Sequence, residues 1–492
     1  MISFTEETRQ KAFSTQRKPE TVESQGLPHV RFHVEEAHLI PAGERPKKFL
    51  EAFAAILKHT NYRFMLDQYS RVSAKCARCS ANCQIYETTH APEDVPCFRS
   101  EMLLSIYRRH FTVGGAVKGR LTGDVGLTEE KIDELADSVY NCTACRRCTL
   151  ECPMGIDHGL ITHLARWILA EIGIAPRALV VSTREQLVGA TGNTSAIPLP
   201  ALQDTIEFLE EEIADYKGVE IKVPMDVEGA EYMFIAPVSD WMMEAETLMG
   251  CICALHAGGV SWTVGTQYYD AINYGLFYSD HHLEQVLHKV EAEVKRLGVK
   301  KILIGECGHA SRSAKFFYNV FAEQLNIPVI NILEVTHDLL KQGKLKFDTE
   351  IIKEKVTYHD PCNIARPGWV IEQPREIIKA FIKNYEEMTP SGRDNLCCGG
   401  GGGTVSIDEL RPYRTLITGR RKAEQIEKTG AEIVIAPCAN CKKQVRELLE
   451  DNEVPVELVG LHDLIYKAII LSDDGIAWHD PMGDDDWTPP DA

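Results

Sequence analysis

The chain has 492 residues, enough for about three domains, and its 44% hydrophobic and 25% charged residues are typical of a soluble globular protein. A formal net charge of −19 argues against nucleic acid and an anionic membrane surface as direct partners, because both are negatively charged. The sequence contains no apolar run of about 18 residues that would span a membrane, and its first residues lack the apolar core of a secretory signal. These features predict a cytoplasmic protein.

Sixteen cysteines are the most informative residues of the chain. In a reducing cytoplasm they are expected to be metal ligands or redox groups rather than disulfides. Residues 1–65 precede all of them and contain one helical pattern, KKFLEAFAAILKH, so we expect an N-terminal arm or helical cap there.

Four cysteines follow the spacing C-x2-C-x2-C-x3-C and directly precede a proline. They are Cys142, Cys145, Cys148 and Cys152. In ferredoxins with this spacing, the first three thiolates hold one [4Fe–4S] cubane and the fourth reaches a second cubane. Structural zinc sites do not use this interleaved arrangement, so the run predicts iron–sulfur clusters.

An earlier group of cysteines departs from that spacing. Cys76, Cys79 and Cys83 occupy its second to fourth positions, while Ser73 stands in the first. A cubane that lacks one thiolate needs another ligand, and Cys97 is the nearby candidate. We therefore predict a helical ferredoxin-like module with two cubanes over residues 66–175. The first cubane is assigned to Cys76, Cys79, Cys97 and Cys152, and the second to Cys83, Cys142, Cys145 and Cys148, with an exchange of Cys83 and Cys97 as the alternative.

A helical connector over residues 176–230 is followed by an internal duplication. EYMFIAPVSD matches KVTYHDPCNI, and VKKILIGECGHASR matches AEIVIAPCANCKKQ; each reads as a strand that ends in a loop. Strands alternating with helices predict α/β units around mostly parallel sheets. We therefore expect an α/β fold with a helical ferredoxin-like module, two duplicated half-domains over residues 231–345 and 346–471, and an acidic flexible tail over residues 472–492.

The second half-domain carries five cysteines that are predicted to bind one iron–sulfur cluster. They are Cys362, Cys397, Cys398, Cys438 and Cys441. Five thiolates, two of them adjacent in the sequence, suit iron–sulfur chemistry better than a four-ligand zinc site. A glycine run at 399–403 follows the adjacent pair, and we expect it to let the backbone approach the sulfur atoms of the cluster.

Of the five ligand positions, the first half-domain keeps only Cys307, which aligns with Cys438, so we expect no complete cluster there. Its loop is predicted to form the wall of the cleft over the metal site. Cys307 and His309 are candidates for a substrate-facing thiol and a proton donor, and the alternative is that the loop is a remnant of a lost site.

Three charged or titratable residues flank Cys362. His359 and Asp360 either donate protons at the site or only fix the turn, and Arg366 either binds an anion or lies on the surface. Cys251 and Cys253 alternate within an apolar run and are expected to be packed in a core.

The order of these motifs resembles the catalytic iron–sulfur subunits of heterodisulfide reductases over about residues 70–470. C…CCG…CxxC, IGECGHA and YHDPCN look most like the DsrK-type subunit of the DsrMKJOP complex or its Hme/Hdr-like relatives. In such subunits a complete CCG motif holds a non-cubane [4Fe–4S] cluster that cleaves a sulfur–sulfur bond. The resemblance assigns this cluster to Cys362, Cys397, Cys398, Cys438 and Cys441.

The resemblance implies an oxidoreductase of the heterodisulfide reductase type, held by a complex at the inner face of the cytoplasmic membrane. Electrons would pass from a quinol-oxidising membrane cytochrome through two cubanes to the non-cubane cluster. The substrate would be the trisulfide of the small sulfur carrier DsrC, or a thiol heterodisulfide, in dissimilatory sulfur metabolism. The alternative is an electron-transfer subunit of a flavin-dependent 2-hydroxyacid or glycerol-3-phosphate dehydrogenase, which would need a flavoprotein partner.

Overall fold

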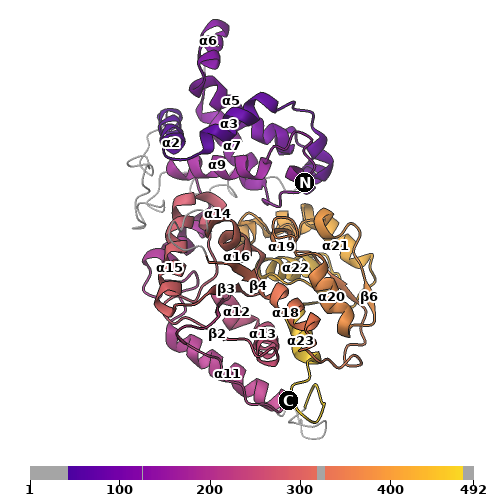
Figure 1. Ribbon diagram of the computed structural model, residues 1–492. Coiled ribbons are helices and arrows are strands. Elements are labelled where there is room, and N and C mark those ends of the chain that lie inside the picture. The colour runs from indigo at the N-terminus through magenta and orange to yellow at the C-terminus, as the bar shows by residue number, and fades with distance from the viewer. Residues whose placement is uncertain (1–42, 125, 319–326, 480–492) are drawn as a thin grey trace, which may run out of the picture.

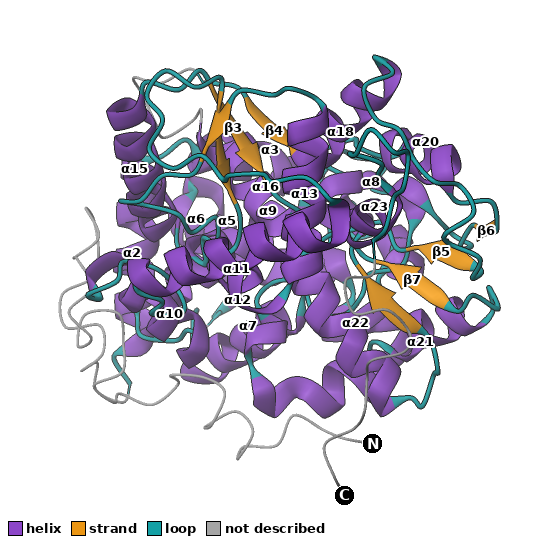
Figure 2. Ribbon diagram, turned by 90° about the horizontal axis from the view of Figure 1, so that it is seen from below, coloured by secondary structure: helices purple, strands orange, loops and turns teal. Residues whose placement is uncertain are grey.

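The computed structural model describes residues 43–124, 126–318 and 327–479. Within them, a helical body formed by the first third of the chain sits on an α/β body formed by the rest (Figure 1). Figure 2 shows two separate groups of strands, each with helices packed around it. Across these ranges, no helix has both the length and the apolar character needed to cross a membrane.

The helical body is built around α9, which is buried on almost every face. Phe53, Leu104, Leu135 and Trp167 come from four different helices and belong to its main apolar core. Since Phe53 lies in the segment predicted as a peripheral arm or cap, that segment is an integral part of the core from α2 onward; residues 1–42 lie outside the described residues. The helices are α2 (Arg45–His59), α3 (Tyr62–Val72), α4 (Gln84–Thr89), α5 (Pro96–Phe111), α6 (Val113–Thr122), α7 (Glu129–Asn141), α8 (Arg147–Leu150) and α9 (His158–Glu171).

Two further helices, α10 (Arg177–Val188) and α11 (Leu199–Lys217), lead into the first sheet. This sheet has four parallel strands in the order β2-β1-β3-β4. The strands are β1 (Tyr232–Ile235), β2 (Trp262–Thr263), β3 (Lys301–Ile304) and β4 (Val329–Asn331). The helices between and after them are α12 (Val238–Met243), α13 (Ala245–Ala257), α14 (Gly275–Tyr278), α15 (Asp280–Leu297), α16 (Gly308–Arg312) and α18 (Ile332–Lys341).

The second sheet also has four parallel strands, in the order β6-β5-β7-β8. Its first and third strands in the chain are central, as in the first sheet, so the loops after β5 and β7 open at the same edge. The strands are β5 (Val356–Tyr358), β6 (Tyr385–Glu386), β7 (Ile433–Ile435) and β8 (Glu457–Val459). The helices are α19 (Cys362–Ala365), α20 (Glu372–Phe381), α21 (Arg420–Glu427), α22 (Ala439–Asp451) and α23 (Leu461–Ala468).

The last described residues pack onto α11. The ring of Trp478 stacks on Tyr216 with centroids 4.6 Å apart, and the Lys217 ammonium donates to the Ala477 carbonyl. The backbone N–H of His479 donates to the Tyr216 carbonyl at 2.9 Å. The flexible tail expected from residue 472 is therefore wrong for the segment that ends at His479, and residues 480–492 lie outside the described residues.

The two sheets are joined through α13 and α23, which approach each other at Gly250. A Cβ at this position would lie 1.9 Å from the carbonyl oxygen of His462, so only glycine permits this spacing. Cys251 and Cys253 are fully buried in the same helix and belong to the core between the sheets.

We expect Gly250→Ala to lower the free energy of unfolding by about 1–3 kcal/mol, because the two helices must move apart. Denaturant unfolding of the full chain measures this change. Gly114→Ala is the matched control, since a Cβ there meets nothing within 4 Å. Equal stability of the two variants would contradict the close approach of α13 and α23.

Candidate metal centre

The loops of the second sheet bring the five cysteines predicted for one cluster to the same place. β5 and β7 are adjacent and parallel, so the loops at their carboxyl ends meet. One cysteine starts α19 after β5, two lie at the start of α22 after β7, and an adjacent pair lies in the loop between α20 and α21. All five side chains are buried; they are Cys362, Cys397, Cys398, Cys438 and Cys441.

Their thiols form a continuous series of contacts. The thiols of Cys145 and Cys362 donate hydrogen bonds to Cys397 and lower the pKa of Cys397. The sulfur atoms of Cys398 and Cys441 are 3.7 Å apart, and Cys441 in turn contacts Cys438. Five residues separated by up to 79 positions therefore converge, because Cys362 and Cys441 lie at the two ends of the set.

This donor set fits an iron–sulfur cluster. Buried thiolates are the soft ligands that such clusters use. Backbone N–H groups also point at two of the sulfur atoms, from Gly399 to Cys397 Sγ at 3.4 Å and from Gly308 to Cys438 Sγ at 3.2 Å. Hydrogen bonds of this kind stabilise cluster-bound thiolates and tune the reduction potential.

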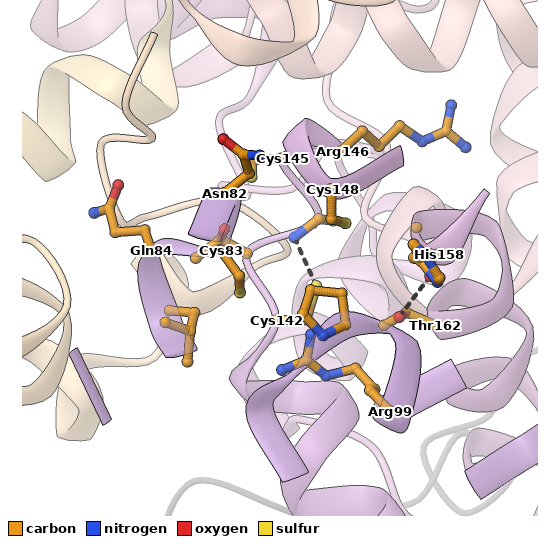
Figure 3. Close-up of a pocket in the computed structure, with 15 residues that line it drawn as sticks. Asn82, Cys83, Gln84, Arg99, Cys142, Cys145, Arg146, Cys148, His158 and Thr162 are labelled. Atoms are coloured by element: carbon orange, nitrogen blue, oxygen red, sulfur yellow. Dashed lines mark hydrogen bonds between the residues drawn. The ribbon is translucent and has the colours of Figure 1, made fainter. Parts of the chain in front are cut away.

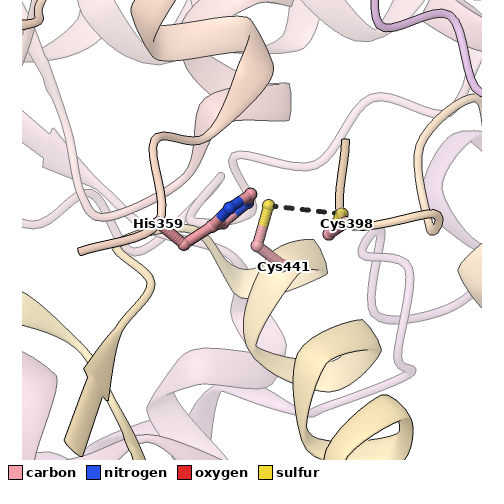
Figure 4. Close-up of side chains that lie close together, drawn as sticks. All are labelled: His359, Cys398 and Cys441. Carbon is pink, nitrogen blue, oxygen red and sulfur yellow. Dashed lines mark hydrogen bonds between the residues drawn. The ribbon is translucent and has the colours of Figure 1, made fainter. Parts of the chain in front are cut away.

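A buried imidazole lies against these thiols (Figure 4). One ring nitrogen of His359 and the sulfur atoms of Cys398 and Cys441 all lie within 4.8 Å of one another. Neither ring nitrogen has a hydrogen-bond partner among the described residues, and burial lowers the pKa of His359 well below its usual value. The ring is therefore neutral and offers an N–H donor or a nitrogen lone pair to the site.

The two charged residues beside Cys362 have structural partners. The carboxylate of Asp360 is paired with the guanidinium of Arg375 at 2.8 Å and accepts the N–H of Gly392 at 2.7 Å. Asp360 therefore fixes the turn and does not face the site. The surface position considered for Arg366 is wrong, because the residue is buried and donates to the carbonyls of Cys145, at 3.0 Å, and Asn395, at 2.6 Å. Its binding of an anion stays a prediction.

The loop after β3 in the first sheet forms the wall of the site. Cys307 is buried, and its thiol hydrogen-bonds that of Cys438. His309 is also buried, with Nε2 2.8 Å from the Asn273 carbonyl and its ring centroid 4.5 Å from that of Phe277. Burial lowers the pKa of His309 to about 4, so the ring is neutral at pH 7.

In the helical body, four cysteines line one cavity (Figure 3). They are Cys83, Cys142, Cys145 and Cys148, the set predicted for the second cubane. The buried guanidinium of Arg99 lines the same cavity and pairs with Asp94 at 3.2 Å. A positive charge beside a cluster stabilises its reduced state.

The cysteines predicted for the first cubane are only partly brought together. Cys79 and Cys97 are buried, and a hydrogen bond from the Cys79 thiol lowers the pKa of Cys97 to about 6. Cys76 is exposed, and Cys152 is half-buried against the helical core. The contact between Cys79 and Cys97 supports their placement on one cluster, while the ligands from the other two residues stay a prediction.

Comparisons with known proteins agree with this division. Residues 74–156 match the 4Fe-4S dicluster domain family, and residues 356–446 match the cysteine-rich CCG domain family. The Hdr-like menaquinol oxidoreductase iron-sulfur subunit 2 of Archaeoglobus fulgidus is 29% identical over 86% of this chain and 83% of its own length. A dihydromethanophenazine:CoB–CoM heterodisulfide reductase subunit of Methanosarcina barkeri is 26% identical over 81% of this chain and 94% of its own. The chain is a heterodisulfide-reductase-like oxidoreductase subunit.

A more distant relative of this reductase-like subunit is the EtfAB:quinone oxidoreductase of Syntrophomonas wolfei. It is 22% identical over 80% of this chain and 57% of its own length. Similarity to this chain thus extends to proteins named for different activities, so the finer function depends on the chemistry of the site rather than on the fold.

The glycine run of the subunit has a second role, in addition to the expected approach of its backbone to the sulfur atoms. A Cβ on Gly401 would lie 2.2 Å from the Thr143 carbonyl oxygen, and one on Gly402 would lie 2.6 Å from that of Cys142. These glycines therefore let the CCG loop approach the backbone of the second ferredoxin motif. The Cys397 thiol also reaches the Thr143 hydroxyl at 3.4 Å.

Two arginines stabilise the same contact between the CCG loop and the second ferredoxin motif by hydrogen bonds. Arg166 of α9 donates to the carbonyls of Cys142, at 2.6 Å, and Gly402, at 2.9 Å, so it binds both sides of the junction. Arg366 binds the Cys145 carbonyl from the CCG side. Sequence reasoning missed these roles, although one signal was present, since Arg166 is the one arginine in the apolar run HGLITHLARWILAE.

We expect Gly401→Ala to separate the CCG loop from the second ferredoxin motif. The variant should lose about 1–3 kcal/mol of stability, because the loop cannot avoid the Thr143 carbonyl without moving. Electron transfer between the helical body and the site should slow, as stopped-flow reduction would show. Gly114→Ala is the control, since a Cβ there meets nothing within 4 Å. Identical stability and reduction rates in both variants would contradict the assignment.

Proposed function

We propose that this chain is the catalytic iron–sulfur subunit of a membrane-associated complex that carries electrons from a quinol to a sulfur–sulfur bond. The observation that carries this proposal is the convergence of five buried cysteines directly against the loop of a ferredoxin motif. Contact between Cys397 and Cys145 joins the two sites within one chain. Cleavage of a sulfur–sulfur bond takes two electrons, which the cubanes would deliver one at a time. A short path between the two sites suits such a relay.

The proposed cofactors are two cubane [4Fe–4S] clusters and one non-cubane [4Fe–4S] cluster. The cavity of the helical body supports the second cubane, and the contact between Cys79 and Cys97 supports the first. The common strand order of the two sheets supports their origin by duplication. The single non-cubane cluster is proposed for the second half-domain, because the first keeps only Cys307 of the five ligand positions. The non-cubane cluster would be held by Cys362, Cys397, Cys398, Cys438 and Cys441.

When bound, the non-cubane cluster supplies thiophilic irons and electrons for cleavage of a sulfur–sulfur bond. For a heterodisulfide, the balanced reaction takes two electrons and two protons and gives two thiols. For a trisulfide, complete reduction takes four electrons and four protons and gives two thiols and one hydrogen sulfide. The buried walls of this chain exclude water from the site. His359 holds a neutral imidazole beside Cys398 and Cys441, and Cys307 adds a thiol from the opposite wall. His309 positions that wall through Asn273 and Phe277.

The proposed partners follow from the relatives and from the sequence resemblance. The name of the Archaeoglobus relative includes menaquinol, and that of the Methanosarcina relative includes a heterodisulfide. We propose a quinol-oxidising membrane cytochrome as the electron donor. A DsrC-like sulfur carrier with a trisulfide, or a thiol heterodisulfide, is the proposed acceptor at a DsrK-type subunit. A complex of this kind holds the chain at the inner face of the cytoplasmic membrane.

Replacement of one cysteine of the adjacent pair tests the catalytic assignment. Cys398→Ser should abolish reduction of the sulfur–sulfur bond and lower the iron content from about twelve to about eight per chain, from four irons per cluster. Both cubanes should stay reducible, as EPR spectra of the dithionite-reduced variant would show. Cys253→Ala is the control, because this buried cysteine belongs to the apolar core between the sheets.

The outcome also distinguishes reduction of a sulfur–sulfur bond from electron transfer for a flavin-dependent dehydrogenase. Retained turnover and twelve irons in Cys398→Ser would refute the cluster assignment. A wild-type protein with twelve irons that reduces no sulfur–sulfur substrate and copurifies with a flavoprotein would instead favour an electron-transfer subunit of a flavin-dependent dehydrogenase. The similarity to the EtfAB:quinone oxidoreductase is the observation that favours this second candidate function.

Replacement of the buried imidazole tests its contact with the cluster. His359→Leu should keep the iron content and change the EPR signal of the non-cubane cluster, because a nitrogen next to two of its ligands is lost. Turnover should fall about 10–100-fold. His359→Gln keeps an N–H donor and should restore part of both properties. An unchanged EPR signal in His359→Leu would show that the ring does not contact the cluster.

A further inference from the structure

Helix α6 projects from the helical body at the end farthest from the α/β body (Figure 1). Its inner face consists of small residues that fit closely onto α5. A Cβ on Gly115 would lie 1.7 Å from the Arg108 carbonyl oxygen, and one on Gly119 would lie 2.1 Å from Arg109 Nε. The glycines fix which face of α6 points inward, so its large side chains must point outward.

The outward face carries three apolar side chains in one stripe. Val113, Val117 and Leu121 are 85%, 54% and 82% exposed. Their spacing of four residues places them on the same side of the helix. Single exposed apolar residues are ordinary, but an aligned series on a projecting helix marks an interaction surface.

Basic residues border this stripe on both sides. At about 100° per residue, Arg120 falls on one side of the apolar series and Lys118 on the other. Residues 102–123 contain four arginines and lysines and no aspartate or glutamate, whereas the whole chain has a net charge of −19. The two arginines at the end of α5 pair with Glu101 and Asp124, so the positive charge of the tip comes from the two basic residues of α6. Helix α6 is therefore a positive, apolar tip on a negative protein.

We propose that α6 docks on the surface of an anionic lipid bilayer, with its apolar stripe in the interface and its basic residues at the headgroups. Shallow insertion of an apolar stripe flanked by Lys and Arg is the arrangement of interfacial helices. Each basic residue near an anionic leaflet adds attraction that acts within a Debye length. The inference goes beyond the proposed function, since it gives the chain its own contact with lipid in addition to any membrane partner.

This proposal departs from the expectation drawn from total charge. A net charge of −19 opposes binding of the molecule as a whole to an anionic bilayer. Salt screens charges that lie farther from the bilayer than a Debye length, so at physiological salt the charges of α6 dominate its interaction with the headgroups. The geometry also defines an orientation. Helix α5 has 16 residues, with Cys97 in its first turn and α6 beyond its last, so it holds the predicted cubanes about 24 Å from the tip.

The experiment is sedimentation of the full chain with vesicles of phosphatidylglycerol and phosphatidylcholine, compared with vesicles of phosphatidylcholine alone. We expect binding to the anionic vesicles, weakened by salt. The variant Val113→Ser/Val117→Ser/Leu121→Ser should lower the bound fraction about tenfold, and Lys118→Gln/Arg120→Gln should reduce it and its salt dependence. The control variant Phe208→Ser/Met243→Ser/Trp369→Ser removes exposed apolar side chains elsewhere and should bind like the wild type.

Two results would overturn the proposal. The first is equal binding by the wild type and the α6 variant. The second is a wild type that does not bind vesicles, together with an α6 variant that fails to copurify with the membrane subunit, which would make the tip a protein-docking surface. Iron content and reduction of a sulfur–sulfur substrate in solution should be unchanged in the α6 variants, so failure of the proposed function would be detected separately.

Discussion

The approach of Gly401 to the Thr143 carbonyl is the contact on which the proposed function depends. It joins a loop of the second sheet to the loop of a ferredoxin motif without an intervening side chain. The thiols of Cys145 and Cys397 meet as a direct result. Since backbone atoms form the closest part of this junction, its spacing cannot adapt by a change of rotamer, and any larger residue must push the two sites apart.

The energetics of this junction explain why arginines are buried in it. A buried guanidinium costs desolvation free energy unless its donors are satisfied. Arg166 and Arg366 satisfy them with the carbonyls of Cys142, Gly402, Cys145 and Asn395 rather than with carboxylates. These hydrogen bonds therefore do not neutralise the positive charges of the two guanidinium groups. They are well placed to stabilise electrons on the clusters proposed for the adjacent cysteines, while their rigid donors fix the backbone that carries these cysteines.

The local part of the site could be predicted from the sequence, and the part made by tertiary contact could not. The spacing from Cys142 to Cys152 predicts cubane ligands because the pattern is contained in one loop. Alternating strands and helices predict parallel α/β units. Such units bring the loops with Cys362 and Cys438 to the same edge of the sheet. The burial of Arg366, the use of the glycine run against Thr143 and the inclusion of α2 in a core each depend on segments far away in the chain, which no local pattern specifies.

The two walls of the site are built alike but contribute different chemistry. The loop after β7 supplies Cys438 and Cys441, whereas the equivalent loop after β3 supplies Cys307 and the N–H of Gly308, both directed at Cys438. The first half-domain therefore contributes a thiol and an N–H donor to the wall instead of a second ligand set. Under the proposed function, this asymmetry leaves Cys307 as a thiol outside the five-cysteine ligand set that can act on a substrate sulfur, whereas a site that only relays electrons needs no such thiol.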